Sequence, residues 1–187
     1  LWGLGEMPFY EVELAPFTYG GDGTTGARIR EAQHKAVELI PGSGIASIND
    51  LAYPYEYDEI HPRRKKEVGE RLSYLALNRT YGMDYLPCEG PRFKSYEVRG
   101  GEIEVAFYNG ESGFSPWHDI VGFEIAGEDK VFHPAEIRRG TQLNTVIVKS
   151  GKVPAPVAVR YCFRDFQVGN FTGRRCLPVI PLRTDNG

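Results

Sequence analysis

The sequence changes character near residue 88, and this change constrains the fold more than any other feature. Before it, segments with strand and helix patterns alternate. That order is typical of a parallel sheet with covering helices. After it, short strands are separated by turns, a spacing typical of a β-sandwich of about 100 residues. The sequence therefore predicts two units, residues 1–87 and 88–187.

The first unit predicts one strand–helix pair followed by another. Phe9 to Ala15 alternates like a strand, and Ala27 to Ile40 has helical spacing. The expected inward face of this helix consists of Ile29, Ala32, Ala36, Val37 and Ile40.

A second strand, Gly44 to Asn49, and a helix from Pro62 to about Tyr81 complete the unit. The expected inward face of that helix comprises Val68, Leu72, Leu75 and Ala76. Two strands alone do not make a stable sheet of this kind. We therefore expect an upstream portion of the same gene product to supply the other strands.

The second unit predicts an antiparallel, β-rich domain. Its best alternating segment is Glu102 to Phe107, which places Ile103, Val105 and Phe107 on one face. Further strands are expected at 123–125, 145–149, 157–161 and 179–182.

Composition excludes several classes of protein. Hydrophobic residues make up 41% and charged residues 25%, a globular balance that argues against wholesale disorder. Apolar runs are only a few residues long, far short of a membrane span. A net charge of −3 gives no electrostatic case for nucleic acid binding.

The cysteines leave two possibilities open. Cys88, Cys162 and Cys176 form no CxxC pair, which argues against a zinc ribbon. Cys162 and Cys176 could bridge a hairpin in an oxidising compartment, or all three could be free thiols.

The strongest catalytic candidates are Asp58 and His61, between the second strand and the second helix. Open α/β sheets place their sites at this edge. Asp58 could accept a hydrogen bond from His61 Nδ1, which leaves Nε2 free to take a proton from a nucleophile. The alternative is a helix start with Asp58 near the cap and His61 exposed.

The run from Asp58 to Leu72, ending at Tyr81-Gly82, resembles the final catalytic block of SGNH-type hydrolases, and more narrowly the sialate O-acetylesterase family. Other segments resemble that family in the same order. They are Pro8 to Tyr10, Leu14 to Pro16, Arg30 to Gln33, Gly122 to Gly127, Phe132 to Ala135, Val159 to Tyr161, Leu177-Pro178 and Arg183 to Asp185.

The resemblance implies the last strand–helix units of a flavodoxin-like, three-layer hydrolase domain followed by a β-sandwich. It implies hydrolysis of O-acetylated sialic acid, or a related glycan, by a Ser-His-Asp mechanism. His61 would be the general base and Asp58 its orienting acid, without metal or cofactor. It also implies a secreted, periplasmic or lysosomal location, with no nucleic acid or membrane partner.

The nucleophilic serine of that family has no counterpart in this sequence. Ser112 lies in a predicted hairpin loop, and Ser43 and Ser47 lack a strand-to-helix elbow. We therefore expect the serine in an upstream segment of the same protein.

Other residues are weaker candidates for binding substrate. Arg30 and Gln33 could reach a sialate carboxylate or glycerol chain, with surface or buried packing as the alternative. Tyr57, with Tyr53 and Tyr55, could stack on a sugar ring or simply pack. Trp117 could belong to a carbohydrate-binding face or fill the sandwich.

Two other functions remain open from the sequence. One is the same chemistry on another glycan, such as acetylated xylan. The other is a non-catalytic carbohydrate-binding module in which Asp58 and His61 are structural.

Overall fold

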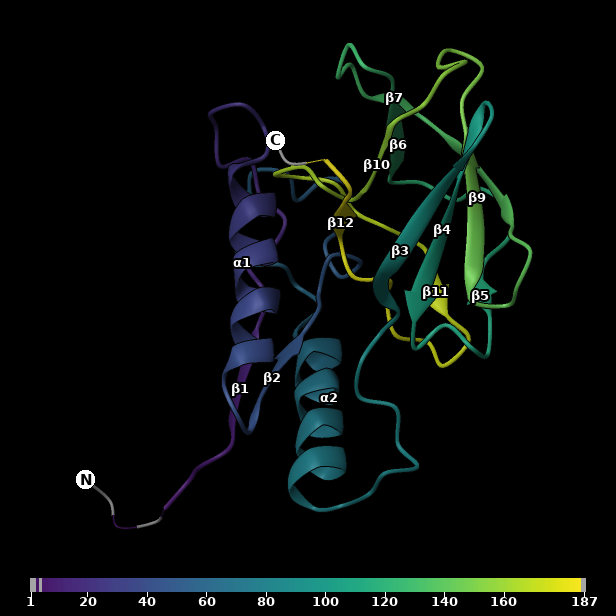
Figure 1. Ribbon diagram of the computed structural model, residues 1–187. Coiled ribbons are helices and arrows are strands. Elements are labelled where there is room, and N and C mark those ends of the chain that lie inside the picture. The colour runs from purple at the N-terminus through teal and green to yellow at the C-terminus, as the bar shows by residue number, and fades with distance from the viewer. Residues whose placement is uncertain (1–2, 4, 186–187) are drawn as a thin grey trace.

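The computed structural model describes residue 3 and residues 5–185, which form an α/β part and a β-rich part (Figure 1). The elements of the α/β part are β1 (Phe9–Val12), α1 (Thr25–Leu39), β2 (Ser43–Ala46), α2 (Lys65–Leu75) and the π-helix η1 (Ala76–Thr80).

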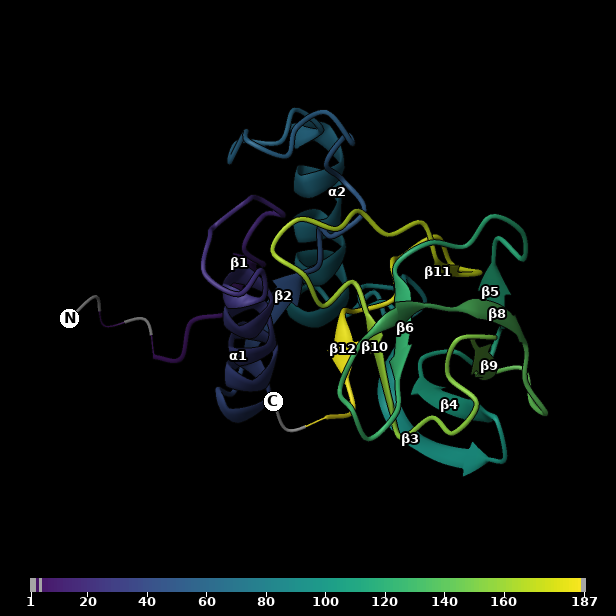
Figure 2. The ribbon, with the colours of Figure 1, turned by 90° about the horizontal axis from the view of Figure 1, so that it is seen from above.

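The two strands of the α/β part are parallel, as the sequence predicts. Phe9 pairs with Ser43 and Val12 with Ala46. Seen from above, β1 and β2 lie between α1 and α2 (Figure 2). The strands are shorter than expected, and α2 begins at Lys65 rather than at Pro62.

The predicted inward face of α1 is wrong, whereas that of α2 is largely right. The buried residues of α1 are Gly26, Ala27 and Arg30, while Ile29 is 46% exposed. Of the other predicted residues, Ala32 and Ile40 are exposed and Ala36 and Val37 are half-buried. In α2, Leu75 is fully buried and Val68 packs against the small core around Ile48.

The remainder of the described chain is β-rich, as predicted. Its strands are β3 (Arg92–Arg99), β4 (Glu102–Tyr108), β5 (Phe114–Ser115), β6 (Phe123–Ala126), β7 (His133–Pro134), β8 (Glu136–Arg139), β9 (Thr145–Lys149), β10 (Ala158–Tyr161), β11 (Thr172–Gly173) and β12 (Leu182–Arg183). The strand expected at 179–182 is displaced, because only Leu182 and Arg183 pair with β10.

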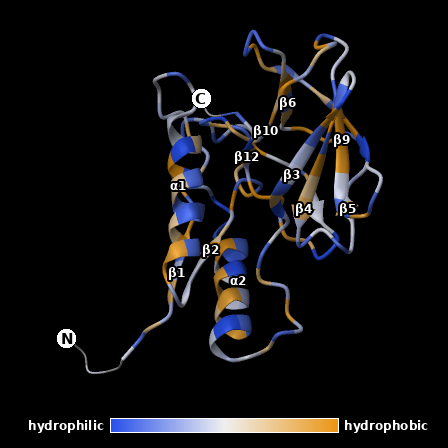
Figure 3. Cartoon of the chain, in the orientation of Figure 1, coloured by the Kyte–Doolittle hydropathy of each residue, from blue (hydrophilic) through white to orange (hydrophobic). Residues whose placement is uncertain are grey.

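Two four-stranded antiparallel sheets share one core, the arrangement of a β-sandwich. Their strand orders are β3-β4-β9-β8 and β12-β10-β6-β7. Ile103 and Val105 of the first sheet meet Ile125 and Val159 of the second in a single buried cluster. Figure 3 shows hydrophobic residues along the central strands β4, β6 and β9.

The outer strands of both sheets are short or charged. β7 and β12 have two residues each, and Pro134 lies in β7. β3 is almost wholly exposed and carries Arg92, Lys94, Glu97 and Arg99, with a bulge between Phe93 and Ser95. β8 carries three charged residues on the opposite edge.

All three cysteines are free thiols, so no bridge joins Cys162 and Cys176 in this structure. Burial raises the pKa of the Cys162 thiol to about 12, which makes it unreactive at neutral pH. Among the described residues, no helix is long and apolar enough to cross a membrane.

Candidate functional site

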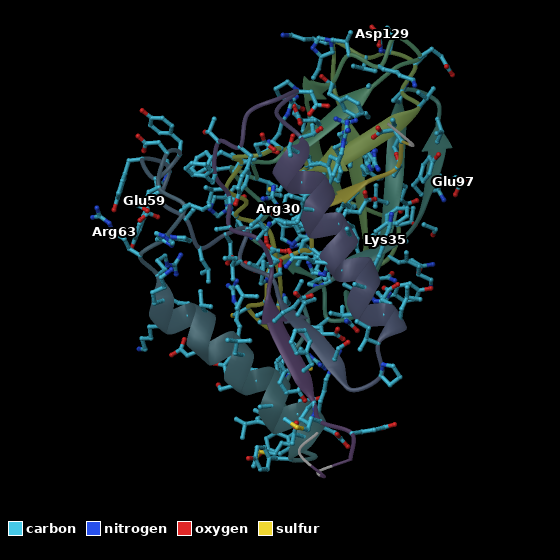
Figure 4. All side chains as sticks on the ribbon, turned by 90° about the vertical axis from the view of Figure 1, so that its left-hand side faces the viewer. Arg30, Lys35, Glu59, Arg63, Glu97 and Asp129 are labelled. Carbon is cyan, nitrogen blue, oxygen red and sulfur yellow. The ribbon has the colours of Figure 1, made fainter. Side chains whose placement is uncertain are left out.

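Asp58 and His61 lie in the loop that connects β2 to α2, and both are exposed. The His61 backbone N–H donates to Glu59 Oε1 at 3.0 Å. No hydrogen bond joins the Asp58 carboxylate to the His61 ring. Figure 4 shows Glu59 and Arg63 of this loop projecting away from the body of the molecule. The two predicted catalytic residues are therefore close in sequence and accessible, but they do not form a dyad here.

A buried carboxylate, Glu56, organises this loop. Glu56 is 1% exposed, and it accepts hydrogen bonds from the backbone N–H groups of Tyr53 at 2.8 Å and Arg63 at 3.2 Å. The Arg63 guanidinium lies 3.6 Å from the same carboxylate. Glu56 thus holds together the two ends of the segment that carries Asp58 and His61.

The base of the loop is tied to α2 by Arg71. Its guanidinium donates two hydrogen bonds of 2.6 Å to the Asp50 carboxylate, a bidentate pair, and one of 2.6 Å to the Ser47 carbonyl. The beginning of the loop therefore has a fixed position relative to α2.

The three tyrosines before the candidate residues are exposed. Tyr53 and Tyr55 stack with ring centroids 5.3 Å apart and planes 5° apart, and the Arg63 guanidinium lies over the Tyr55 ring. Tyr57 instead packs edge-on against Phe166 of the β-rich part. The expectation that Tyr57 binds a sugar is compatible with this exposure.

Arg30 does not face solvent, contrary to the expected substrate contact. Only 1% of its surface is exposed. Its guanidinium donates to the carbonyl of Arg164 and, at 3.5 Å, to that of Ala15. Figure 4 labels Arg30 on α1. Arg30 therefore joins the α/β part to the β-rich part.

Gln33 is also occupied by the backbone. Its Oε1 accepts from the Leu14 N–H at 2.7 Å, and its Nε2 donates to the Val12 carbonyl at 3.3 Å. The backbone N–H groups of Phe9 and Glu13 donate to carbonyls on the β2 side of β1. Because successive residues of a strand alternate in direction, the backbone groups of Val12 and Leu14 point to the opposite edge of β1. The Gln33 amide thus takes the place of a neighbouring strand at the end of β1, and its expected contact with substrate stays a prediction.

Asp165 of the β-rich part connects the loops around the candidate site. Its Oδ1 accepts from the Gly26 N–H at 2.7 Å, and its backbone bonds to Phe17 and Gly23. The Thr18 N–H and hydroxyl in turn donate to the Tyr57 carbonyl at 3.0 and 2.8 Å. The β-rich part therefore supports the segment just before Asp58.

No serine of the described residues bonds to His61. Ser43 Oγ donates to the Val37 and Ile40 carbonyls, and Ser47 Oγ donates to Asn49. Within the part of the chain that the structure describes, no group of His, Cys, Asp and Glu is arranged to hold a metal ion.

Sequence reasoning missed Glu56, Arg71 and Asp165. Nothing in their spacing marks them, because Arg71 pairs with a residue 21 positions away and Asp165 caps a helix 139 positions away. An acidic residue inside an aromatic loop was the one available signal for Glu56.

In fold, the described chain is similar to part of a carbohydrate esterase. The solved structure concerned is a carbohydrate acetylesterase from Xanthomonas citri, with a TM-score of 0.84 and 39% sequence identity. The similarity covers 96% of this chain but 41% of that structure. Neither the models of known protein families nor the curated proteins give a match.

Proposed function

We propose that this chain is part of a carbohydrate O-acetylesterase and contributes Asp58 and His61 to a Ser-His-Asp mechanism. The observation that carries this proposal is the similarity to a carbohydrate acetylesterase over nearly the whole chain. A sialate ester acetylated at the 9-position is the proposed substrate, and acetylated xylan or another glycan is the alternative. The secreted or lumenal location is part of the same proposal.

In this mechanism His61 Nε2 accepts the proton of a serine hydroxyl while the serine oxygen attacks the acetyl carbonyl carbon. The tetrahedral intermediate expels the sugar oxygen, which takes the proton back from His61. Water then attacks the acyl carbon and gives a proton to His61. The bond to the serine oxygen breaks, that oxygen takes the proton from His61, and acetate is released. Asp58 would orient the ring and stabilise the imidazolium. Catalytic hydrogen bonds often tighten only with substrate bound, which accommodates the separate Asp58 and His61 side chains.

The serine would come from an upstream segment of the same protein. That segment and residues 1–87 would together form one α/β domain, in which residues 1–87 are the last part. A β-sandwich of residues 88–187 would follow this domain. An uncovered apolar surface supports this. Phe9 of β1 is 58% exposed, and Ile40, directly after α1, is 49% exposed. A further parallel strand and its helix would cover such a surface.

The test is acetate release by the intact protein from 9-O-acetyl sialic acid and from acetylated xylan. His61→Ala is expected to lower kcat by about 10³-fold or more. His118→Ala, an exposed histidine of the β-rich part, is the matched control and should retain full activity. Undiminished turnover in His61→Ala would remove His61 from the mechanism.

The stacked, exposed Tyr53 and Tyr55 favour a second candidate function, a non-catalytic glycan-binding module. Glycan binding by the intact protein without any acetate release would support that function instead. The isolated 187-residue chain should release no acetate under either proposal.

A further inference from the structure

A groove of about 400 Å³ lies at one end of the β-rich part, where none of the candidate catalytic residues is found. Its walls are the turn before β5 and the turn between β8 and β9, with Trp117 and Arg174 between them. Figure 2 shows β5 and β8 on the side of the β-rich part away from α1. We call this feature the Trp117 groove.

The aromatic side of the groove is rigid. Phe114 is 1% exposed, and Trp117 packs edge-on against it and against Phe171, with centroid distances of 6.1 and 5.7 Å. The Arg139 guanidinium lies over the Trp117 ring, 5.2 Å from a ring centroid. Two fixed aromatic neighbours and a stacked arginine leave the indole little freedom to move.

The polar side of the groove is held by a buried carboxylate beneath it. Glu104 accepts from the Thr141 N–H at 2.6 Å and from the hydroxyls of Thr141 and Thr145 at 2.7 and 2.8 Å. A side chain at Gly140 would overlap Thr145 and Glu104, so only glycine fits there. The turn between β8 and β9 is therefore fixed before any ligand arrives.

The charge of the groove is one-sided. Its lining includes Arg139 and Arg174 but no aspartate or glutamate. Among the described residues, neither arginine has a carboxylate partner, whereas the adjacent Arg138 pairs with Glu102 at 2.6 Å. In a chain with a net charge of −3, two unpaired guanidinium groups in one groove favour an anionic ligand.

We propose that the Trp117 groove binds a carboxylate-bearing sugar unit of a glycan. Its volume lies within the range of small-molecule sites, about 300 to 1,000 Å³, and exceeds the needs of a simple inorganic anion. Guanidinium groups match a carboxylate in geometry, while Trp117 and Gln142, which also line the groove, offer an apolar ring and an amide to a sugar. The choice of a sugar acid over another carboxylate rests on the proposed function.

The test measures binding to the intact protein by calorimetry, with digalacturonic acid and sialyllactose as acidic probes and lactose as the neutral probe. We expect an acidic probe to bind and lactose not to bind. The two acidic probes distinguish a uronate from a sialate. Arg139→Gln and Arg174→Gln should each weaken binding about tenfold or more, because each removes a hydrogen bond to a charged group.

Arg138→Gln is the matched control, because it removes the same charge from the neighbouring position of β8 outside the groove. Its affinity should equal that of the unaltered protein. Equal weakening in all three variants, binding of lactose as tight as that of the acids, or no binding of either acid would each overturn the proposal.

The same preparations separate this inference from the proposed function. The groove variants should release acetate from a small acetyl ester at the unaltered rate. If acetate release depends on His61 but no acidic probe binds through Arg139 and Arg174, the groove proposal is wrong and the esterase proposal stands. Acid binding without any acetate release would retain the groove and overturn the esterase.

Discussion

Glu13 is a charged residue in the interior of the α/β part, with 2% of its surface exposed. Its carboxylate accepts from the Ile48 N–H at 2.8 Å and lies 2.8 Å from His34 Nε2. Burial alone raises the pKa of this carboxyl. The hydrogen bond and charge of His34, the charge of Arg30 and the Ile48 N–H outweigh burial and hold the pKa below its ordinary value.

A carboxyl with a lowered pKa stabilises the folded state above its ordinary pKa, and this stabilisation is lost as the pH falls. Glu13→Gln should therefore lower the free energy of unfolding by about 3 kcal/mol at pH 7, and by less at acidic pH. Urea unfolding between pH 7 and pH 3.5 measures this, with the exposed Glu6→Gln as the control. Parallel stability curves for the unaltered protein and Glu13→Gln would contradict it.

At this scale the sequence indicated which residues are chemically notable but not what they contact. Arg30 and Gln33 were expected to bind substrate, yet both satisfy backbone groups. The Arg30 partner Arg164 lies 134 positions away, a contact that no local pattern encodes. Asp58, His61 and Tyr57 are accessible, so their proposed roles are still predictions.

At the scale of elements, the start of α1 depends on a residue from the other half of the chain. Thr24 occupies the N-cap position, but its side chain accepts no hydrogen bond from the first turn of α1. The Gly26 N–H donates to Asp165 Oδ1 instead. An uncapped helix end leaves unsatisfied N–H groups, so Asp165 supplies what the local sequence does not.

Asp165→Ala should destabilise the protein by about 1 to 2 kcal/mol, the usual cost of losing a helix cap. Asp165→Asn keeps an acceptor oxygen and should cost less. Denaturant midpoints measure both, and Asp84→Ala, at an exposed position, serves as control. Equal effects of Asp165→Ala and Asp84→Ala would show that the distant cap contributes nothing.

The hydrophobic periodicity of the sequence predicted the positions of the long helices and strands better than it predicted which of their faces are buried. Both helices and the central strands β4, β6 and β9 follow the predicted ranges closely, whereas β1 and β2 are parallel as predicted but shorter. The inward face of α1 was wrong because the helix buries Arg30, a polar residue that no apolar stripe includes. β3 and β8 escaped prediction because their exposed residues do not alternate with buried ones.

At the scale of the molecule, the α/β part and the β-rich part differ in how much hydrophobic core each has of its own. The large buried cluster is drawn wholly from the β-rich part. The α/β part has the small core around Ile48, and its buried groups bond across to the other part. Asn49 donates to the Val179 carbonyl, and Arg183 pairs with Glu31 at 3.0 Å.

Residues 88–187 alone should therefore unfold cooperatively in urea, whereas residues 1–87 alone should show no cooperative transition. Circular dichroism of the two fragments, beside the 187-residue chain, measures this. A sigmoidal unfolding curve for residues 1–87 would show that the α/β part folds without the β-rich part.

The outer strands of the sandwich have a consequence for how copies of this protein meet. Two are only two residues long, one with a proline, and the other two carry rows of charge, one with a bulge. Short length, proline, charge and a bulge each hinder a second chain from pairing its own strand with the edge of a sheet. Concentrated solutions of the folded protein should therefore resist growth of strand-to-strand aggregates from the β-rich part.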